Sequence, residues 1–194
     1  LTRPVRATRS APAQFLSPGQ WVGEVVRAGA GVDGVRPGQL VVGLAGVSGL
    51  ASHVTCSATA VHALPADVDA TKVAASLGAY LGAMYILRHV IHLQPGERVL
   101  VNGETGEAIA AALLARRAGA QVLALTRSGQ TAEALRAVGV EPVFQTVEAV
   151  HERFSPSRGE WIDVVYECGD ASGDGLEQLP ISPEGPCVLS AQGR

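Results

Sequence analysis

The stretch RVLVNGETGEAIAAALLARRAGAQVLALTRS, residues 98–128, decides the fold class of this chain. Its first apolar run, residues 98–101, has the length and composition of a buried strand. An Ala- and Leu-rich run of helical length follows at residues 108–118 and ends at Gly119, and a second strand-like run occupies residues 121–125. A strand, a helix and a second strand in this order predict a parallel pair joined by a right-handed crossover.

The same alternation continues to the end of the chain. Helices are predicted at residues 131–138 and 147–154, a short helical turn at 176–179, and strands at 141–144, 162–166 and 186–190. The sequence therefore predicts an α/β fold whose second half is a Rossmann-type parallel sheet with helices on both faces.

The first half has a different pattern. Short strands separated by Gly- and Pro-rich turns are predicted at residues 21–28, 40–43, 51–56 and 60–64, which is typical of a small β-barrel or part of one. Residues 1–18 have no clear period and are expected to be irregular. Helical spacing follows at residues 72–77 and 81–93, with Asp67 or Asp69 as the cap and a break near Gly78.

Pro95 and Gly96 mark a stop between the two patterns. We expect one domain over residues 1–94 and a nucleotide-binding domain over residues 95–194.

Composition excludes several classes of function. The chain has 194 residues, 47% of them hydrophobic, and a net charge of −3, so it lacks the basic surface that binds nucleic acid or anionic membranes. No signal peptide is visible, and no stretch reaches membrane-spanning length without a charge or a breaker. The three cysteines are widely spaced and predict buried thiols rather than disulfides or a structural zinc site. The sequence predicts a soluble, cytoplasmic protein with no nucleic-acid or membrane partner.

Several segments together resemble the medium-chain dehydrogenase/reductase superfamily, and in particular the enoyl reductase domain of polyketide and fatty acid synthases. They are VVRAGAGV at residues 25–32 with RPG at 36–38, LQPGERVLV at 93–101, the segment from Gly159 to Tyr166, PEG at 183–185 and the final Gly-Arg pair. The resemblance covers residues 19–194 and implies a Rossmann domain preceded by a partial GroES-like β-barrel. It also implies that both ends of the fold are truncated.

The resemblance implies NADPH as the cofactor and the turn after residue 101 as the loop that holds it. The family pattern GAAGGVG corresponds here to NGETGEA, residues 102–108, which is about one residue shorter and has fewer glycines. Gly103, Thr105 and Gly106 are the expected cofactor-binding residues. Glu104 and Glu107 add two carboxylates that complement a helix dipole in place of a phosphate. The alternative interpretation is an ordinary helix-capping turn.

The end of the next strand favours NADP over NAD. Thr126, Arg127 and Ser128 follow it, and this segment has no Asp or Glu to bind a ribose 2′-hydroxyl. We expect these three residues to contact the cofactor, with a solvated surface role for Arg127 as the alternative.

The catalytic residues stay unknown from the sequence. Enoyl reduction needs a proton donor. The resemblance implies a tyrosine or a lysine–aspartate pair in that role, but no matching tyrosine precedes residue 80, and Lys72 is the only lysine. By the same resemblance, Tyr85 corresponds to a packing position of the family and Gly82 replaces a threonine near the nicotinamide. Glu167–Cys168 stands at the position that lies beside the nicotinamide pocket in the family.

No metal site is expected. Gly19-Gln20-Trp21 replaces the GHE segment of zinc alcohol dehydrogenases, and His53 and Cys56 have the spacing of a ligand pair without a third ligand.

Two hypotheses of function remain. In the first, the chain is a degenerate enoyl-reductase-like domain of a polyketide or fatty acid synthase, with weak or no NADPH binding and a structural or interaction role. In the second, it is an active NADPH-dependent enoyl reductase that acts on enoyl thioesters bound to a carrier protein. Both imply other synthase domains and an acyl carrier protein as partners. The kept framework and the altered cofactor loop favour the first.

Overall fold

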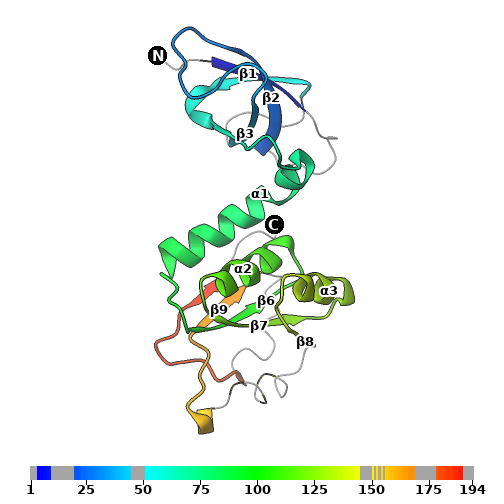
Figure 1. Ribbon diagram of the computed structural model, residues 1–194. Coiled ribbons are helices and arrows are strands. Elements are labelled where there is room, and N and C mark those ends of the chain that lie inside the picture. Colours follow the sequence, from blue (N-terminus) through cyan, green and yellow to red (C-terminus); the bar gives the residue numbers. More distant parts are fainter. Residues whose placement is uncertain are drawn as a thin grey trace. The chain divides into compact units, whose positions relative to one another are not determined.

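The computed structural model describes residues 4–9, 20–44, 51–144, 150, 152, 154, 156–168 and 178–189. The chain divides into two compact units, Leu1–Gly78 and Ala79–Arg194 (Figure 1). The sequence placed this boundary after residue 94. It lies earlier because the helical residues from Ala79 onward, among them the buried Ala83 and Leu87, pack into the core of the second unit.

The first unit contains a five-stranded antiparallel sheet in the order β4-β1-β2-β3-β5. Its strands are β1 (Pro4–Arg9), β2 (Gln20–Ala28), β3 (Leu40–Leu44), β4 (His53–Ser57) and β5 (Val61–Ala63). The four strands β2 to β5 confirm the sequence prediction within a few residues at each end. This sheet is the portion of the barrel that was expected in the first half.

The prediction that residues 1–18 are irregular was wrong for β1. This strand lies between β4 and β2 and pairs with both. Pro4 is its first residue, where a missing N–H is tolerated. Pairing on both sides stabilises a segment whose local sequence carries little strand signal.

Alternate residues of β2 and β3 pack on opposite faces of this sheet. Trp21, Val25 and Val41 belong to one buried cluster, and Val22 and Val42 belong to another. Ala74 of the first helix packs in the second cluster. The alternation is what strand geometry requires when both faces are covered.

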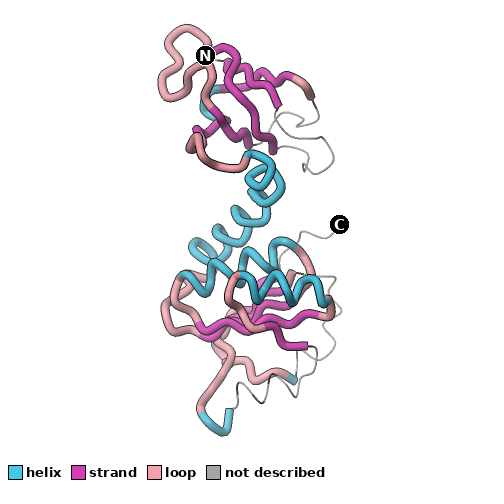
Figure 2. The backbone as a smooth tube through the Cα atoms, turned by 45° about the vertical axis from the view of Figure 1, so that its right-hand side comes forward, coloured by secondary structure: helices cyan, strands magenta, loops and turns pink. Residues whose placement is uncertain are grey.

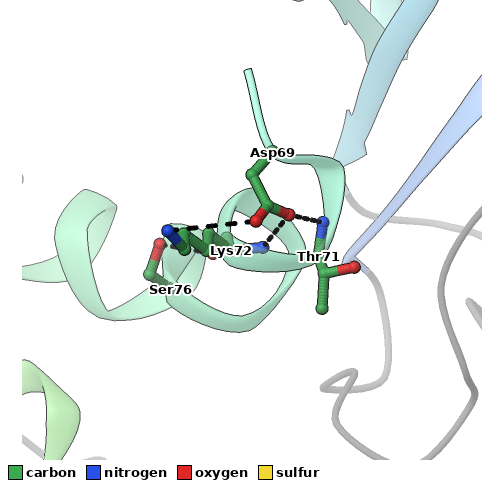
Figure 3. Close-up of polar contacts among 4 residues, drawn as sticks. All are labelled: Asp69, Thr71, Lys72 and Ser76. Atoms are coloured by element: carbon green, nitrogen blue, oxygen red, sulfur yellow. Dashed lines mark hydrogen bonds and ion pairs between the residues drawn. The ribbon is translucent and has the colours of Figure 1, made fainter. Parts of the chain in front are cut away.

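The helix α1 (Ala70–Tyr85) begins at a side-chain cap. Asp69 Oδ1 accepts hydrogen bonds from the backbone N–H groups of Thr71, at 2.9 Å, and Lys72, at 3.2 Å (Figure 3). The Lys72 ammonium lies 4.0 Å from the same carboxylate, and the Ser76 hydroxyl donates to the Lys72 carbonyl oxygen. Asp69 is therefore the cap that the sequence predicted as one of two candidates.

The predicted break near Gly78 does not occur, since α1 runs through it. A Cβ atom at Gly78 would lie 2.9 Å from the side-chain oxygen of Gln20 on β2. The glycine therefore permits close packing of the helix against the strand, which a sequence pattern does not distinguish from a helix stop.

A π-helical turn, Ile86–Val90, continues α1, and His92 follows in the left-handed conformation with φ of 52°. By length and composition alone, the continuous helical stretch Ala70–Val90 could cross a membrane. This is weak support for a membrane span, because core helices of globular proteins pass the same test. The stretch also carries Lys72 and Arg88.

The second unit contains a five-stranded parallel sheet in the order β10-β9-β6-β7-β8. Its strands are β6 (Arg98–Asn102), β7 (Gln121–Thr126), β8 (Pro142–Phe144), β9 (Val164–Glu167) and β10 (Cys187–Leu189). When β6 to β10 are renumbered 1 to 5 in chain order and the sheet is read from β8, the order is 3-2-1-4-5, as in a Rossmann fold. The fold class predicted from the sequence is confirmed.

Two helices of this unit, α2 (Gly106–Arg117) and α3 (Gly129–Ala137), lie side by side on one face of the sheet (Figures 1 and 2). Both confirm predicted helices. The helix predicted at residues 147–154 lies largely outside the described residues, as does the turn predicted at 176–179.

Neighbouring residues of each strand supply the two cores of the unit. Val99, Val101 and Tyr166 pack in the cluster that contains α2, whereas Leu100 and Val165 pack in the cluster on the opposite face. Both faces of β6 and β9 are therefore buried, as expected for the central strands of a parallel sheet.

Replacing Gly43 by alanine should destabilise the first unit. A Cβ atom at Gly43 would lie 2.1 Å from the buried indole ring of Trp21, so the ring must move. We expect a loss of about 1–3 kcal/mol, the usual cost of overpacking a core. Urea denaturation followed by circular dichroism and tryptophan fluorescence measures it.

The matched control is Val26→Ala on β2, where the side chain is 47% exposed. Its cost should stay within about 1 kcal/mol. Equal stability of Gly43→Ala and the unmodified protein would show that the Trp21 ring is not held against this strand.

Candidate nucleotide site

The carboxyl ends of β6, β7 and β9 lie at one edge of the sheet, because these strands are parallel and adjacent. The chain leaves β6 toward β7 on one side, and β9 packs on the other side of β6. This reversal makes the β6–β9 boundary the topological switch point, where open α/β sheets bind their ligands. The residues that follow these three strands are therefore the candidate site.

At the switch point, β6 and β9 are held in close contact. The N–H of Cys168 donates to the carbonyl oxygen of Asn102 at 2.7 Å, and the side-chain amide of Asn102 donates to Glu167 Oε2, also at 2.7 Å. Gly103 has φ of +147°, and a Cβ atom there would lie 2.5 Å from the Cys168 carbonyl oxygen. Only glycine fits at position 103 without a shift of the backbone.

The first turn of α2 holds a buried carboxylate. Thr105 is the N-cap, and its hydroxyl oxygen accepts from the N–H of Ala108 at 3.3 Å. Glu107 lies in this turn with only 3% of its surface exposed. The Tyr166 hydroxyl, on the fully buried side chain of β9, donates to Glu107 Oε1 at 2.7 Å. A carboxyl group of the protein itself therefore lies where the helix dipole favours negative charge.

The other carboxylate of the loop, Glu104, contacts the end of β7 instead of α2. The Thr126 hydroxyl donates to Glu104 Oε2 at 2.6 Å, and the backbone N–H of Arg127 donates to Glu104 Oε1. Thr126 is 1% exposed, and Ser128 is the N-cap of α3, so this carboxylate lies where β7 turns into α3. We call the donor groups of residues 126–128 that surround it the β7 nest.

Glu104 is ionised at neutral pH. Partial burial opposes its charge, but hydrogen bonds from Thr126, Arg127, Thr131 and Ser128 together hold the pKa of this carboxyl below its ordinary value. The side chain itself is exposed on its outer side. The β7 nest is thus filled by a charged group that solvent and ligands can reach.

At the end of β9 the net pKa shift has the opposite direction, because burial outweighs the hydrogen bonding there. Burial raises the pKa of Glu167, although the hydrogen bond from Asn102 opposes the shift. Burial, followed by the negative charges of Glu107 and Glu167, raises the pKa of the Cys168 thiol far above its ordinary value. Cys168 is therefore a protonated, buried thiol, as the sequence predicted, and is unsuited to act as a nucleophile.

The structure brings together all six residues that the sequence assigned to the cofactor. Gly103, Thr105 and Gly106 form the turn after β6, and Thr126, Arg127 and Ser128 form the turn after β7. The hydrogen bonds of Glu104 join these two turns. Sequence reasoning placed both glutamates at the α2 dipole, which holds for Glu107 and was wrong for Glu104.

Sequence reasoning also missed two pairs of side chains, Asn102 with Glu167 and Glu107 with Tyr166. Each pair joins residues far apart in the chain, so no local pattern could indicate it. The available signal in the sequence was a polar residue directly after each of two predicted strands: Asn102 after residues 98–101 and Glu167 after residues 162–166.

The remaining candidates lie away from this edge or do not form a site. His53 is exposed and Cys56 is buried on β4, on opposite faces of the strand, so they cannot share a metal ion. Among the described residues, no group of three or more His, Cys, Asp or Glu side chains could hold a metal.

Tyr85 was predicted to pack in the core, and this was wrong. It is 62% exposed, since it lies on the side of the helical stretch opposite the buried Ala83 and Leu87. Its ring lies against that of His89, with centroids 5.6 Å apart and planes tilted by 32°.

Replacing Glu167 by glutamine should stabilise the second unit at neutral pH. The raised pKa means that burial of this carboxyl is best tolerated when it is protonated. The favourable contribution of Glu167 to the free energy of unfolding is therefore fully present below the ordinary glutamate pKa of about 4.3. It is lost as the pH rises through the raised pKa of Glu167 in the folded protein. Glutamine keeps an oxygen acceptor for Asn102 and never ionises.

Urea denaturation across this pH window tests the prediction. The stability advantage of Glu167→Gln should increase from acid to neutral pH, while Glu133→Gln, at an exposed position on α3, should show no such trend. A Glu167→Gln variant that is less stable than the unmodified protein at neutral pH would contradict it.

Comparison with known proteins agrees with this arrangement. No family model matches the chain. A phenolphthiocerol/phthiocerol polyketide synthase of Mycobacterium tuberculosis is 35% identical over 167 residues, which are 83% of this chain and 8% of that protein. The chain thus spans a small fraction of the synthase that it matches.

Solved structures have the same fold. The CurK enoyl reductase is 30% identical, with a TM-score of 0.74, over 91% of this chain and 54% of that one. The Escherichia coli quinone oxidoreductase, solved in complex with NADPH, is 20% identical with a TM-score of 0.75, over 96% of this chain and 64% of that one, and shows the fold alone. Over most of its length, this chain is similar to enoyl reductase domains of polyketide synthases, and it has the fold of the medium-chain dehydrogenase/reductase superfamily.

Proposed function

We propose that this enoyl-reductase-like domain has lost tight binding of NADPH and has a structural or interaction role within a polyketide or fatty acid synthase. The observation that carries the proposal is the placement of Glu104 and Glu107 at the carboxyl edge of the parallel sheet. That edge, beside the N-terminus of the first helix, is where a Rossmann domain binds a pyrophosphate.

The N-terminus of α2 is the expected pyrophosphate site of this domain. A pyrophosphate binds there because helix N–H groups and the dipole favour negative charge. Glu107 supplies a carboxylate in that turn and is held by Tyr166, so the favourable interaction is already used within the protein.

Repulsion between a carboxylate of the protein and a phosphate of the cofactor is large enough to matter for binding. Two unit charges about 4 Å apart near a protein surface repel by about 4 kcal/mol. This energy corresponds to roughly a thousandfold in a dissociation constant. One carboxylate close to a cofactor phosphate is therefore enough to turn micromolar binding into millimolar binding. Glu104, whose pKa is lowered, retains its charge at neutral pH.

The alternative is an active NADPH-dependent enoyl reductase for enoyl thioesters on an acyl carrier protein. The 30% identity to the CurK enoyl reductase and the intact strand order of the nucleotide domain favour it. In both cases we propose other synthase domains and the acyl carrier protein as partners, because the relative named above is a polyketide synthase.

Calorimetric titration with NADPH separates the two functions. We expect the unmodified chain to show no saturable binding below about millimolar NADPH, as the repulsion estimate requires. Glu107→Gln keeps an acceptor for the Tyr166 hydroxyl and removes the charge, so it should bind NADPH at least about tenfold more tightly. Glu133→Gln is the matched control, since it removes an exposed charge from α3 and should change nothing.

Micromolar binding by the unmodified chain would overturn the proposal. Reduction of a crotonyl thioester should then be assayed with the same sample, and turnover would establish the alternative.

A further inference from the structure

We propose that Glu104 is a specificity determinant that excludes a ribose 2′-phosphate from this domain, so that a nucleotide with an unphosphorylated ribose is favoured. The inference concerns the same edge as the proposed function and rests on that site being nucleotide-derived. The proposal concerns the relative affinity of this edge for two kinds of nucleotide. A measurement of NADPH affinity alone does not determine that ratio.

The geometry places an anion in the β7 nest. One carboxylate oxygen accepts from the hydroxyl of the buried Thr126, at 2.6 Å, and the other accepts from the N–H of Arg127. Hydroxyl and backbone N–H donors at a strand–helix turn are the groups that bind a phosphate monoester. In this chain their acceptor is Glu104, which comes from the loop after β6.

The location of the nest identifies the part of a nucleotide that would meet it. In a Rossmann domain, the end of the second strand contacts the 2′ position of the adenosine ribose. An acid at this point accepts hydrogen bonds from ribose hydroxyls, whereas basic or hydroxyl side chains accommodate a 2′-phosphate. β7 is the second strand of this unit, and Thr126 is its last residue.

The position of Glu104 argues against the preference for NADP that the sequence alone favours. The segment Thr126-Arg127-Ser128 contains no acid, and the sequence alone favours a 2′-phosphate there. The acid is delivered from a different loop, across the edge of the sheet. A 2′-phosphate would have to displace the Glu104 carboxylate or share the nest with it, while a 2′-hydroxyl could donate to it.

A purely structural cap is the competing explanation, and it makes a different prediction. If Glu104 only caps the turn after β7, its replacement changes stability and leaves the preference between nucleotides unchanged. A selectivity ratio distinguishes the two explanations, because loss of stability affects both ligands equally.

The test compares adenosine 2′,5′-bisphosphate with adenosine 5′-monophosphate on the full chain, by calorimetry or by amide chemical shifts. These probes differ only in the 2′-phosphate. We expect the bisphosphate to bind the unmodified protein no more tightly than the monophosphate. In Glu104→Gln and Glu104→Ala, the ratio of affinities should move at least about tenfold toward the bisphosphate. Glu133→Gln should retain the ratio of the unmodified protein.

A ratio that is the same in all four proteins would overturn the inference, as would tighter binding of the bisphosphate to the unmodified chain. Absence of binding of either probe to every variant at millimolar concentration would overturn it too, because the edge would then hold no ribose subsite. Failure of the proposed function is recognised separately: the unmodified chain would bind NADPH at micromolar concentration, whatever the ratio in the Glu104 variants.

Discussion

The parallel pairing of β6, β7 and β9 creates the candidate nucleotide site. It places three strand ends and the beginnings of two helices at one edge of a sheet whose two faces are both buried. Backbone N–H groups and helix dipoles at such an edge attract negative charge, and in related folds the charge comes from a cofactor. In this chain, carboxylates of its own sequence lie there. Glu104 thus gives this edge a negative charge from within the protein.

The carboxylates at this edge differ in their electrostatic situation. Glu104 is hydrogen-bonded to the β7 nest and reaches solvent, so its charge is stabilised. Glu167 is buried against Asn102, and its charge is disfavoured. The loop after β6 thus supplies the exposed charge of this edge, and the switch point contributes close packing through Gly103 and Cys168.

Sequence patterns predicted the elements whose residues carry a local signal. The apolar runs of β6 and β7 and the Ala-rich α2 are recognisable because burial on both faces dictates their composition. β1 was missed because its pairing with two strands lies outside its own sequence. Gly78 was misread because a glycine that allows close packing and a glycine that ends a helix look alike. The six candidate cofactor residues were assigned from the resemblance to the reductase family, and the parallel strand order brings them to one edge of the sheet. The direction of the Glu104 side chain depends on how the turn after β6 meets the turn after β7. The spacing of residues in the sequence does not predict this contact.

The most direct test of the account is a pH titration of the Arg127 amide by two-dimensional NMR. If the Glu104 carboxylate accepts its N–H, this resonance should shift with an apparent pKa below the ordinary glutamate value. The transition should vanish in Glu104→Gln and persist in Glu133→Gln. An Arg127 amide that shows no such transition in the unmodified protein would mean that the nest is not filled by Glu104, and the central claim would fall.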